Sequence, residues 1–286
     1  TETLVAESAS IRRARAGNAV GIAGMLVEAA DVNQALAARR LRHDYPEQRL
    51  RDSIAEGDHL ISVQGARVGQ INGLTQIDLG DWRFGLPVRV TARTHAGTSG
   101  LLNIEREVDM SGPIHDKGVL ILHSYLSALF AHIAPLALNA SVVFEQEYQG
   151  VEGDSASCAE LYALLSSLSD LPLHQGIAVT GAVNQHGDVL PVGGINEKIE
   201  GWFRVCEAQG LTGEQGVLIP ERNRRHLMLD TPVLEAVERG LFHIYTAEHV
   251  SDGLTLMTGQ PSGLPCDTRQ SSYPQDSVLA RAELNL

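Results

Sequence analysis

Two patterns of apolar residues divide this chain and constrain what it can fold into. From about residue 61 onwards, short apolar or alternating runs are separated by glycine-containing turns, which is typical of β-strands. Further along, helix-like segments at 117–133, 157–168 and 196–209 lie between short apolar runs. Because hairpins are followed by strands that alternate with helices, we expect an α+β fold with mixed sheets and flanking helices.

The first 60 residues have a different character, rich in Ala and Arg, with apolar residues near helical spacing from residue 29 to residue 45. The sequence therefore predicts a helical segment at 1–60 and a main domain at 61–265. A flexible tail is expected at 266–286, because Ser, Asp, Pro and Gln are frequent after residue 261. Within the main domain, the dipeptide Asn72–Gly73 predicts a hairpin turn.

Composition excludes several classes of protein. The net charge of −13 argues against a general nucleic-acid binder, and no apolar run approaches the ~18–20 residues that a membrane span needs. Three dispersed cysteines (Cys158, Cys206 and Cys266) form neither a disulfide framework nor a metal clamp, which favours a reducing compartment such as the cytoplasm. The chain starts at Thr1 without a signal peptide or an initiator Met, so we expect it to be part of a longer protein.

The stretch YQGVEGDSASCA places Ser155 on a loop that opens directly into a helix. Gly153 allows a sharp turn, and the first amides of the helix have no partners within it. Those amides could stabilise an anion that forms beside Ser155, as an oxyanion hole does. The alternative is an ordinary helix cap, in which Asp154, Ser155 or Ser157 binds the free amides and has no catalytic role.

A second stretch, GDVLPVGGINEKIEG, places Lys198 in the first turn of a helix. It is one of only two lysines in the chain, the other being Lys117. The positive end of the helix dipole, together with burial, would lower the pKa of a lysine there, and a neutral lysine can take a proton from a serine hydroxyl. The alternative is a solvated lysine that Glu197 and Glu200 hold in its charged form.

Taken together, three strings make the sequence similar to a known family. VEGDSAS (151–157), AVTG (178–181) and LPVGGINEKIEG (190–201) resemble the proteolytic domain of Lon proteases, most of all the archaeal-type branch and its bacterial homologues. The likeness covers roughly residues 65 to 265, and the matching strings keep their order. They also include VGQINGL (68–74), FGLPVRVTA (84–92), NIEREVDMSGPIHDKGVLIL (103–122), FEQEYQG (144–150) and GVLIPERNRRHL (216–227).

The resemblance implies a role for five residues. Ser155 matches the family's nucleophile and Lys198 its general base, so the expected mechanism is that of a Ser–Lys dyad peptidase. Thr180 matches a threonine whose hydroxyl contacts the lysine. Asp154 matches the residue before the serine, and Glu152 matches an acidic residue near the dyad, although its charge would oppose a neutral lysine.

Segment 1–60 resembles the end of the AAA+ ATPase module that precedes the proteolytic domain in Lon proteins. No Walker A string occurs here, so we expect no cofactor in this chain, and ATP and Mg for a module upstream. The resemblance also implies a hexameric ring that cleaves unfolded or damaged proteins, with no need for nucleic acid. A catalytically silent module for assembly or substrate holding remains the alternative, and the presence of both Ser155 and Lys198 favours the enzyme.

Overall fold

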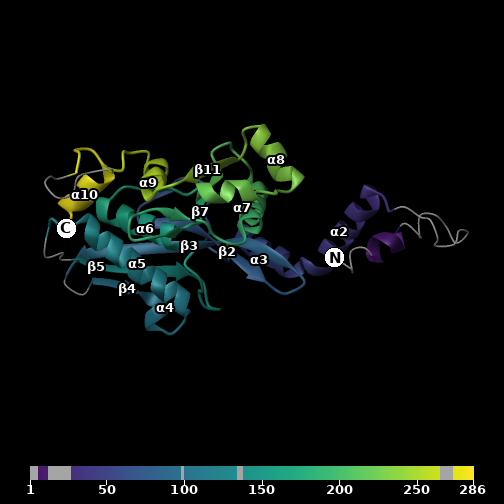
Figure 1. Cartoon of the computed structure of the whole chain (residues 1–286), viewed down its shortest axis with the longest axis horizontal. Coiled ribbons are helices and arrows are strands. Elements are labelled where there is room, and N and C mark those ends of the chain that lie inside the picture. The colour runs from purple at the N-terminus through teal and green to yellow at the C-terminus, as the bar shows by residue number, and fades with distance from the viewer. Residues whose placement is uncertain (1–5, 12–26, 98–99, 134–137, 265–272) are drawn as a thin grey trace, which may run out of the picture. The chain divides into compact units, whose positions relative to one another are not determined.

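The computed structural model describes residues 6–11, 27–97, 100–133, 138–264 and 273–286. It divides into two compact units, which are Thr1–Ser53 with Asp78–Arg83 and Ile54–Ile77 with Phe84–Leu286. Figure 1 traces the chain. Among the described residues, no helix has the length and apolar character that crossing a membrane requires.

The helices are α2 (Ala29–His43), α3 (Tyr45–Ala55), α4 (Ile104–Glu107), α5 (Pro113–Leu129), α6 (Ser157–Ser169), α7 (Ile195–Gln209), the 3-10 helix η1 (Glu221–His226), α8 (Thr231–Glu238), α9 (Val250–Thr258) and α10 (Val278–Leu284). The strands are β1 (Ala66–Arg67), β2 (Gln70–Asp78), β3 (Arg83–Ala96), β4 (Gly100–Asn103), β5 (Leu138–Glu145), β6 (Leu173–His174), β7 (Ile177–Val179), β8 (Ala182–Val183), β9 (Val189–Leu190), β10 (Gly216–Pro220) and β11 (His243–Ala247).

The described part of the smaller unit before residue 54 is mainly helical, and the unit also includes the segment Asp78–Arg83 between β2 and β3. Glu28 and Asp31 form a capping box at the start of α2, where the Glu28 N–H donates to Asp31 Oδ2 at 3.0 Å. Pro46 lies in the first turn of α3, the place in a helix where proline is tolerated. The indole N–H of Trp82 donates to Glu47 Oε2 at 2.9 Å, so the segment between β2 and β3 belongs to this unit.

The larger unit is built on a seven-stranded sheet in the order β11-β10-β7-β2-β3-β5-β4. Strand β10 pairs in parallel with β7 and β11, β2 pairs in parallel with β7, and β4 pairs in parallel with β5. Strand β3 instead runs antiparallel to β5. The sheet is therefore mixed, and the expected α+β class with a mixed sheet and flanking helices is confirmed.

Helix α6 lies at the centre of the core. Every residue of α6 except Ser167 is buried, and α6 contacts α5, α10 and β5 (Figure 1). A helix that packs against other elements on all sides has apolar residues on all its faces. The loop that carries Ser155 leads directly into this helix, so the core itself positions the start of α6.

The hairpin prediction at Asn72–Gly73 is wrong, because both residues lie inside strand β2. The Asn72 side chain is fully buried, and its Nδ2 donates to the carbonyls of Ser62 and Gln175, both at 2.8 Å. These two contacts of the Asn72 Nδ2 with other segments favour the strand over a turn at this position.

The segment 266–286 differs from the flexible tail that its composition predicts. Residues 265–272, including Cys266, lie outside the described residues, whereas helix α10 follows them with Val278, Leu279 and Ala282 buried. The Ser277 hydroxyl caps this helix by accepting from Ala280 N–H at 3.1 Å. Tyr273 is also buried, and its hydroxyl donates to the Leu129 carbonyl at 2.6 Å. These apolar contacts explain why the end of the chain packs on the core.

Candidate active site

Ser155 lies on the short loop before α6, and hydrogen bonds fix its backbone to the segment that follows β7. The Gly181 N–H donates to the Ser155 carbonyl at 2.8 Å, and the Thr180 hydroxyl donates to the same oxygen at 3.3 Å. In return, the Cys158 N–H donates to the Gly181 carbonyl at 3.1 Å. Gly153 has a φ of 86°, a conformation that favours glycine and lets the chain turn towards the helix.

Lys198 approaches this loop from the first turn of α7. Gly194, with a φ of 65°, precedes the helix, and its carbonyl accepts the Lys198 N–H at 3.0 Å. Only 3% of the lysine surface is exposed. Its Nζ lies 2.9 Å from Ser155 Oγ and 3.2 Å from Thr180 Oγ1. Three residues that are far apart in the sequence therefore meet in one cluster, in which Thr180 and Lys198 are buried and Ser155 is half-buried.

The environment of the amine lowers its basicity. Burial lowers the pKa of Lys198 to about 8, whereas the negative charge of Asp154 acts in the opposite direction. A substantial fraction of neutral amine is therefore present just above neutral pH. Such a lysine can accept a proton from a hydroxyl at hydrogen-bond distance.

Two glycines that the sequence reasoning did not single out allow α7 to approach β3. A Cβ on Gly85 would overlap the backbone of Glu197 and Lys198, and a Cβ on Gly201 would overlap the backbone of Gly85. The helix turn that carries Lys198 therefore rests directly on β3. A glycine inside a strand indicates such a close approach, so Gly85 was the available signal in the sequence.

Glu152 and Asp154 lie on either side of Gly153, and each contacts groups other than the Lys198 amine. The Glu152 carboxylate lies over Gly112, where a Cβ would overlap it. The Asp154 carbonyl accepts from the Ser157 hydroxyl at 2.6 Å and from the Ser157 N–H at 3.1 Å. The Ser157 side chain is thus used to order the loop before α6.

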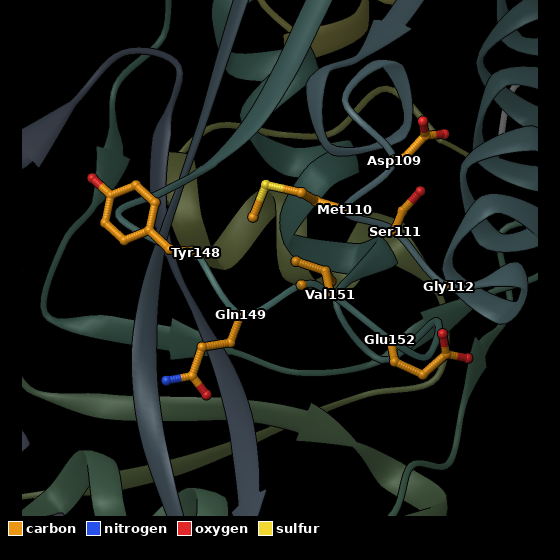
Figure 2. Close-up of a pocket in the computed structure, with 9 residues that line it drawn as sticks. Asp109, Met110, Ser111, Gly112, Tyr148, Gln149, Val151 and Glu152 are labelled. Atoms are coloured by element: carbon orange, nitrogen blue, oxygen red, sulfur yellow. The ribbon is translucent and has the colours of Figure 1, made fainter.

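Two hollows flank the segment that leads to Ser155. A narrow pocket of about 50 Å³ includes Ser155 and apolar side chains of Leu74, Val88, Phe144, Val151 and Ala156. A wider pocket of about 390 Å³ lies between residues 109–112 and 148–152, with Glu152 and Asp109 at its wall (Figure 2). Both pockets share residues 150–152. Ser155 therefore lines a hollow that adjoins the wider pocket at residues 150–152.

Comparisons with known proteins identify the family to which this chain is similar. Residues 149–257 match the family described as the Lon protease (S16) C-terminal proteolytic domain. A Lon protease homolog of Escherichia coli (strain K12) is 43% identical over 228 residues, 79% of this chain and 39% of the relative. A homolog of the same name from Haemophilus influenzae is 42% identical, covering 70% of this chain and 34% of that protein.

An archaeal Lon protease of Thermoplasma acidophilum is 31% identical over 226 residues, 74% of this chain and 32% of the relative. These matches show that residues 149–257 form part of a proteolytic domain. This chain belongs to the Lon protease family and contains its C-terminal proteolytic domain. It spans between 32% and 39% of the length of these three relatives.

Proposed function

We propose that this Lon-type peptidase domain cleaves peptide bonds with a Ser–Lys dyad, in which Ser155 is the nucleophile and Lys198 the general base. The observation that carries the proposal is the distance of 2.9 Å between Lys198 Nζ and Ser155 Oγ inside a buried site. Burial supports it further, because a lysine whose pKa is about 8 supplies a neutral amine near physiological pH.

The reaction begins when the neutral Lys198 amine accepts the proton of the Ser155 hydroxyl. The Ser155 oxygen attacks the carbonyl carbon of the substrate peptide, and backbone N–H groups near Asp154 and Ser155 stabilise the negative oxygen that forms. The Lys198 ammonium then donates its proton to the leaving amine. Finally, the neutral amine activates a water molecule that hydrolyses the acyl–Ser155 ester.

Thr180 orients the amine for this reaction. Its hydroxyl proton points to the Ser155 carbonyl, at 3.3 Å, so its lone pairs are free to accept an N–H of Lys198, at 3.2 Å. A neutral amine has two hydrogens and one lone pair. When Thr180 accepts one N–H, the lone pair can point at the Ser155 hydroxyl. Asp154 adjusts the same amine through its charge, and Glu152 adds an acidic side chain two residues before Asp154.

For the longer protein, we propose the activity that the resemblance to Lon proteases implies. The chain would act as the peptidase part of an ATP-dependent, cytoplasmic Lon-like protease that cleaves unfolded or damaged proteins and assembles as a homohexamer. ATP and Mg would then bind to an upstream AAA+ module. Two buried free cysteines, Cys158 and Cys206, are compatible with a reducing compartment.

A direct test compares hydrolysis of a fluorogenic peptide and of casein by the wild-type chain, Ser155→Ala and Lys198→Met. The expected result is hydrolysis by the wild type and a loss of more than ~1000-fold in both variants, because each removes a member of the dyad. Hydrolysis that is equal in all three proteins would contradict the proposal. A folded wild-type chain that binds casein without cleaving it, even when joined to its ATPase module, would favour the silent substrate-holding module instead.

A further inference from the structure

One asparagine side chain binds the backbone of the loop that leads to Lys198. Asn223 exposes only 2% of its surface and lies in η1, the short helix that directly follows β10. Its Oδ1 accepts the N–H of Val192 at 2.9 Å, and its Nδ2 donates to the carbonyl of Val192 at 2.9 Å. Because hydrogen bonds are directional, two of them to a single residue fix both the position and the orientation of its backbone.

The loop between Val192 and α7 has little conformational preference of its own. It consists of Gly193 and Gly194, and glycine populates more backbone conformations than other residues. Gly194 has a φ of 65°, and a Cβ there would lie 2.5 Å from Gln76 Oε1, so the Gln76 amide of β2 packs against this glycine. The course of the chain into α7 is therefore set by side chains of other elements, on one side by Gln76 and before the two glycines by Asn223.

The first turn of α7 is bound to the same region of the chain. Asn196 lies two residues before Lys198, and its Nδ2 donates to the His226 carbonyl at 3.2 Å. Its Oδ1 accepts the N–H of Met228 at 2.8 Å. The segment 223–228 therefore holds the chain both before and after the two glycines.

Asn223 and Thr180 leave the sheet at the same edge. Strands β7 and β10 are parallel neighbours, so their carboxyl ends lie side by side. Thr180 follows β7, and its N–H donates to the Leu218 carbonyl of β10 at 3.1 Å, whereas Asn223 follows the end of β10. One rigid pair of strands thus carries the hydroxyl that contacts the Lys198 amine and the amide that binds the loop before Lys198.

We propose that Asn223 is a positioning residue for Lys198: its two hydrogen bonds to Val192 fix the start of α7 to the sheet edge that carries Thr180, so that the amine meets the Ser155 hydroxyl. The effect on hydrolysis rests on the proposed function of Lys198 as general base, whereas the placement of the amine does not.

Kinetics of two variants test the positioning. Asn223→Leu has a similar shape and makes neither hydrogen bond, and Asn223→Asp keeps the acceptor but loses the donor. At a pH on the plateau of the pH–rate profile, where the amine is neutral, we expect kcat to fall ~100-fold in Asn223→Leu and ~10-fold in Asn223→Asp, because small displacements of a reacting group have effects of this size. KM is expected to stay within about threefold of the wild type.

Asn72→Leu is the matched control for loss of a buried amide. It makes the same substitution and removes two hydrogen bonds to the carbonyls of Ser62 and Gln175, which lie outside the loop before α7. We expect it to lose stability but to keep kcat within about threefold of the wild type. The proposal is overturned if either folded Asn223 variant keeps kcat within about twofold of the wild type, or if Asn72→Leu loses as much kcat as Asn223→Leu.

A second measurement reports the placement of the amine without any hydrolysis. The chain has only two lysines, so ¹⁵N-labelled lysine gives two Nζ signals, which Lys198→Met assigns, with the exposed Lys117 as the reference. In a Ser155→Ala background, the pKa of Lys198 is expected to be higher in Asn223→Leu than in Ser155→Ala alone, because an amine that leaves its buried position is better solvated. An equal pKa in the two proteins overturns the positioning role, whatever the fate of the proposed function. Hydrolysis that persists in Ser155→Ala contradicts the proposed function alone.

Discussion

Thr180 Oγ1 lies 3.2 Å from Lys198 Nζ and holds the amine beside the Ser155 hydroxyl. We expect Thr180→Val to lower kcat about tenfold, because loss of one hydrogen bond of ~1.4 kcal/mol corresponds to that factor. KM is expected to change little, since the side chain is buried below the nucleophile. Thr180→Ser keeps the hydroxyl and serves as the matched control. A Thr180→Val enzyme as fast as Thr180→Ser would contradict this role.

The pH dependence of hydrolysis reports the protonation of Lys198. Because the pKa of Lys198 is about 8 and the amine must be neutral, kcat/KM of the wild type is expected to rise with pH to a plateau above a midpoint near 8. Two units below the midpoint, the rate is expected to be ~100-fold lower than on the plateau.

Asp154→Asn tests how the charge of Asp154 affects the pKa of Lys198. The negative charge of Asp154 raises the pKa of Lys198, so its removal is expected to move the midpoint to lower pH. The measurement is kcat/KM between pH 5 and pH 10 with a fluorogenic peptide. A midpoint that moves upward in Asp154→Asn, or a wild-type profile that is flat through pH 8, would show that another group controls the rate.

Lys198→Met is expected to stabilise the folded chain while it abolishes hydrolysis. The folded-state pKa of Lys198 is lowered to about 8 from a usual value near 10.5, so between these values the unfolded chain binds more protons. Wild-type stability therefore rises with pH across that window, and below pH 8 the full cost of the buried charge is present.

At pH 7 the variant is expected to gain on the order of 1–3 kcal/mol in free energy of unfolding. The gain should shrink as pH rises from 8 towards 10.5, because the wild-type amine is then neutral in the folded state and its buried charge no longer opposes folding. Urea unfolding of the wild type and of Lys198→Met at several pH values measures this difference in the free energy of unfolding. A variant that is less stable than the wild type at pH 7 would be inconsistent with a strongly buried amine.

The close approach of α7 to β3 depends on two glycines. A Cβ on Gly85 or Gly201 would overlap backbone atoms that cannot move away singly, so both Gly85→Ala and Gly201→Ala are expected to displace the first turns of α7. We expect each to lose on the order of 1–3 kcal/mol of stability and at least ~10-fold in kcat. Gly193→Ala is the matched control, because a Cβ there meets nothing within 4 Å. The measurements are peptide hydrolysis and thermal unfolding of the three variants. If all three have the same kcat and the same stability, the two glycines are not needed for the packing of α7 on β3.

Glu160→Gln tests whether the buried carboxyl is protonated. Its pKa is raised to about 8 from a usual value near 4.5, so the folded chain binds the extra proton between these values. Stability therefore falls as pH rises through this window, and the loss is complete above pH 8. The variant has no such titration, and its stability relative to the wild type is expected to increase from pH 5 to pH 9. Parallel stability curves would show that Glu160 is ionised throughout.

Ser155 and Lys198 could be singled out from the sequence, because each follows a glycine-containing turn and begins a helix. The helix dipole and burial were reasons to consider a weakened lysine base, but a solvated lysine stayed open as the alternative until the resemblance to Lon proteases was added. What the sequence could not give is the distance between them, which depends on the order of β7 and β10 in the sheet and on the hydrogen bonds that join residues 155 and 181. Local patterns carry no information on such long-range pairing.

The sequence predictions that differ from the structure also failed because of long-range contacts. Asn72–Gly73 is a strong local hairpin signal, but tertiary contacts of the Asn72 amide with Ser62 and Gln175 place the pair in a strand. The composition of the last 21 residues suggested a tail, whereas a few apolar side chains around Leu279 were enough to dock a helix. The buried ring of His115 lies near Asn103 and Glu160, which come from other elements, so no local pattern could indicate these contacts.

Helix α6, which is buried along almost its whole length, begins two residues after Ser155. A helix in that position cannot open locally without exposing the apolar interior, so the geometry of the nucleophile is tied to global unfolding. Heat inactivation and loss of tertiary structure in this domain are therefore expected to follow one cooperative transition with a shared midpoint.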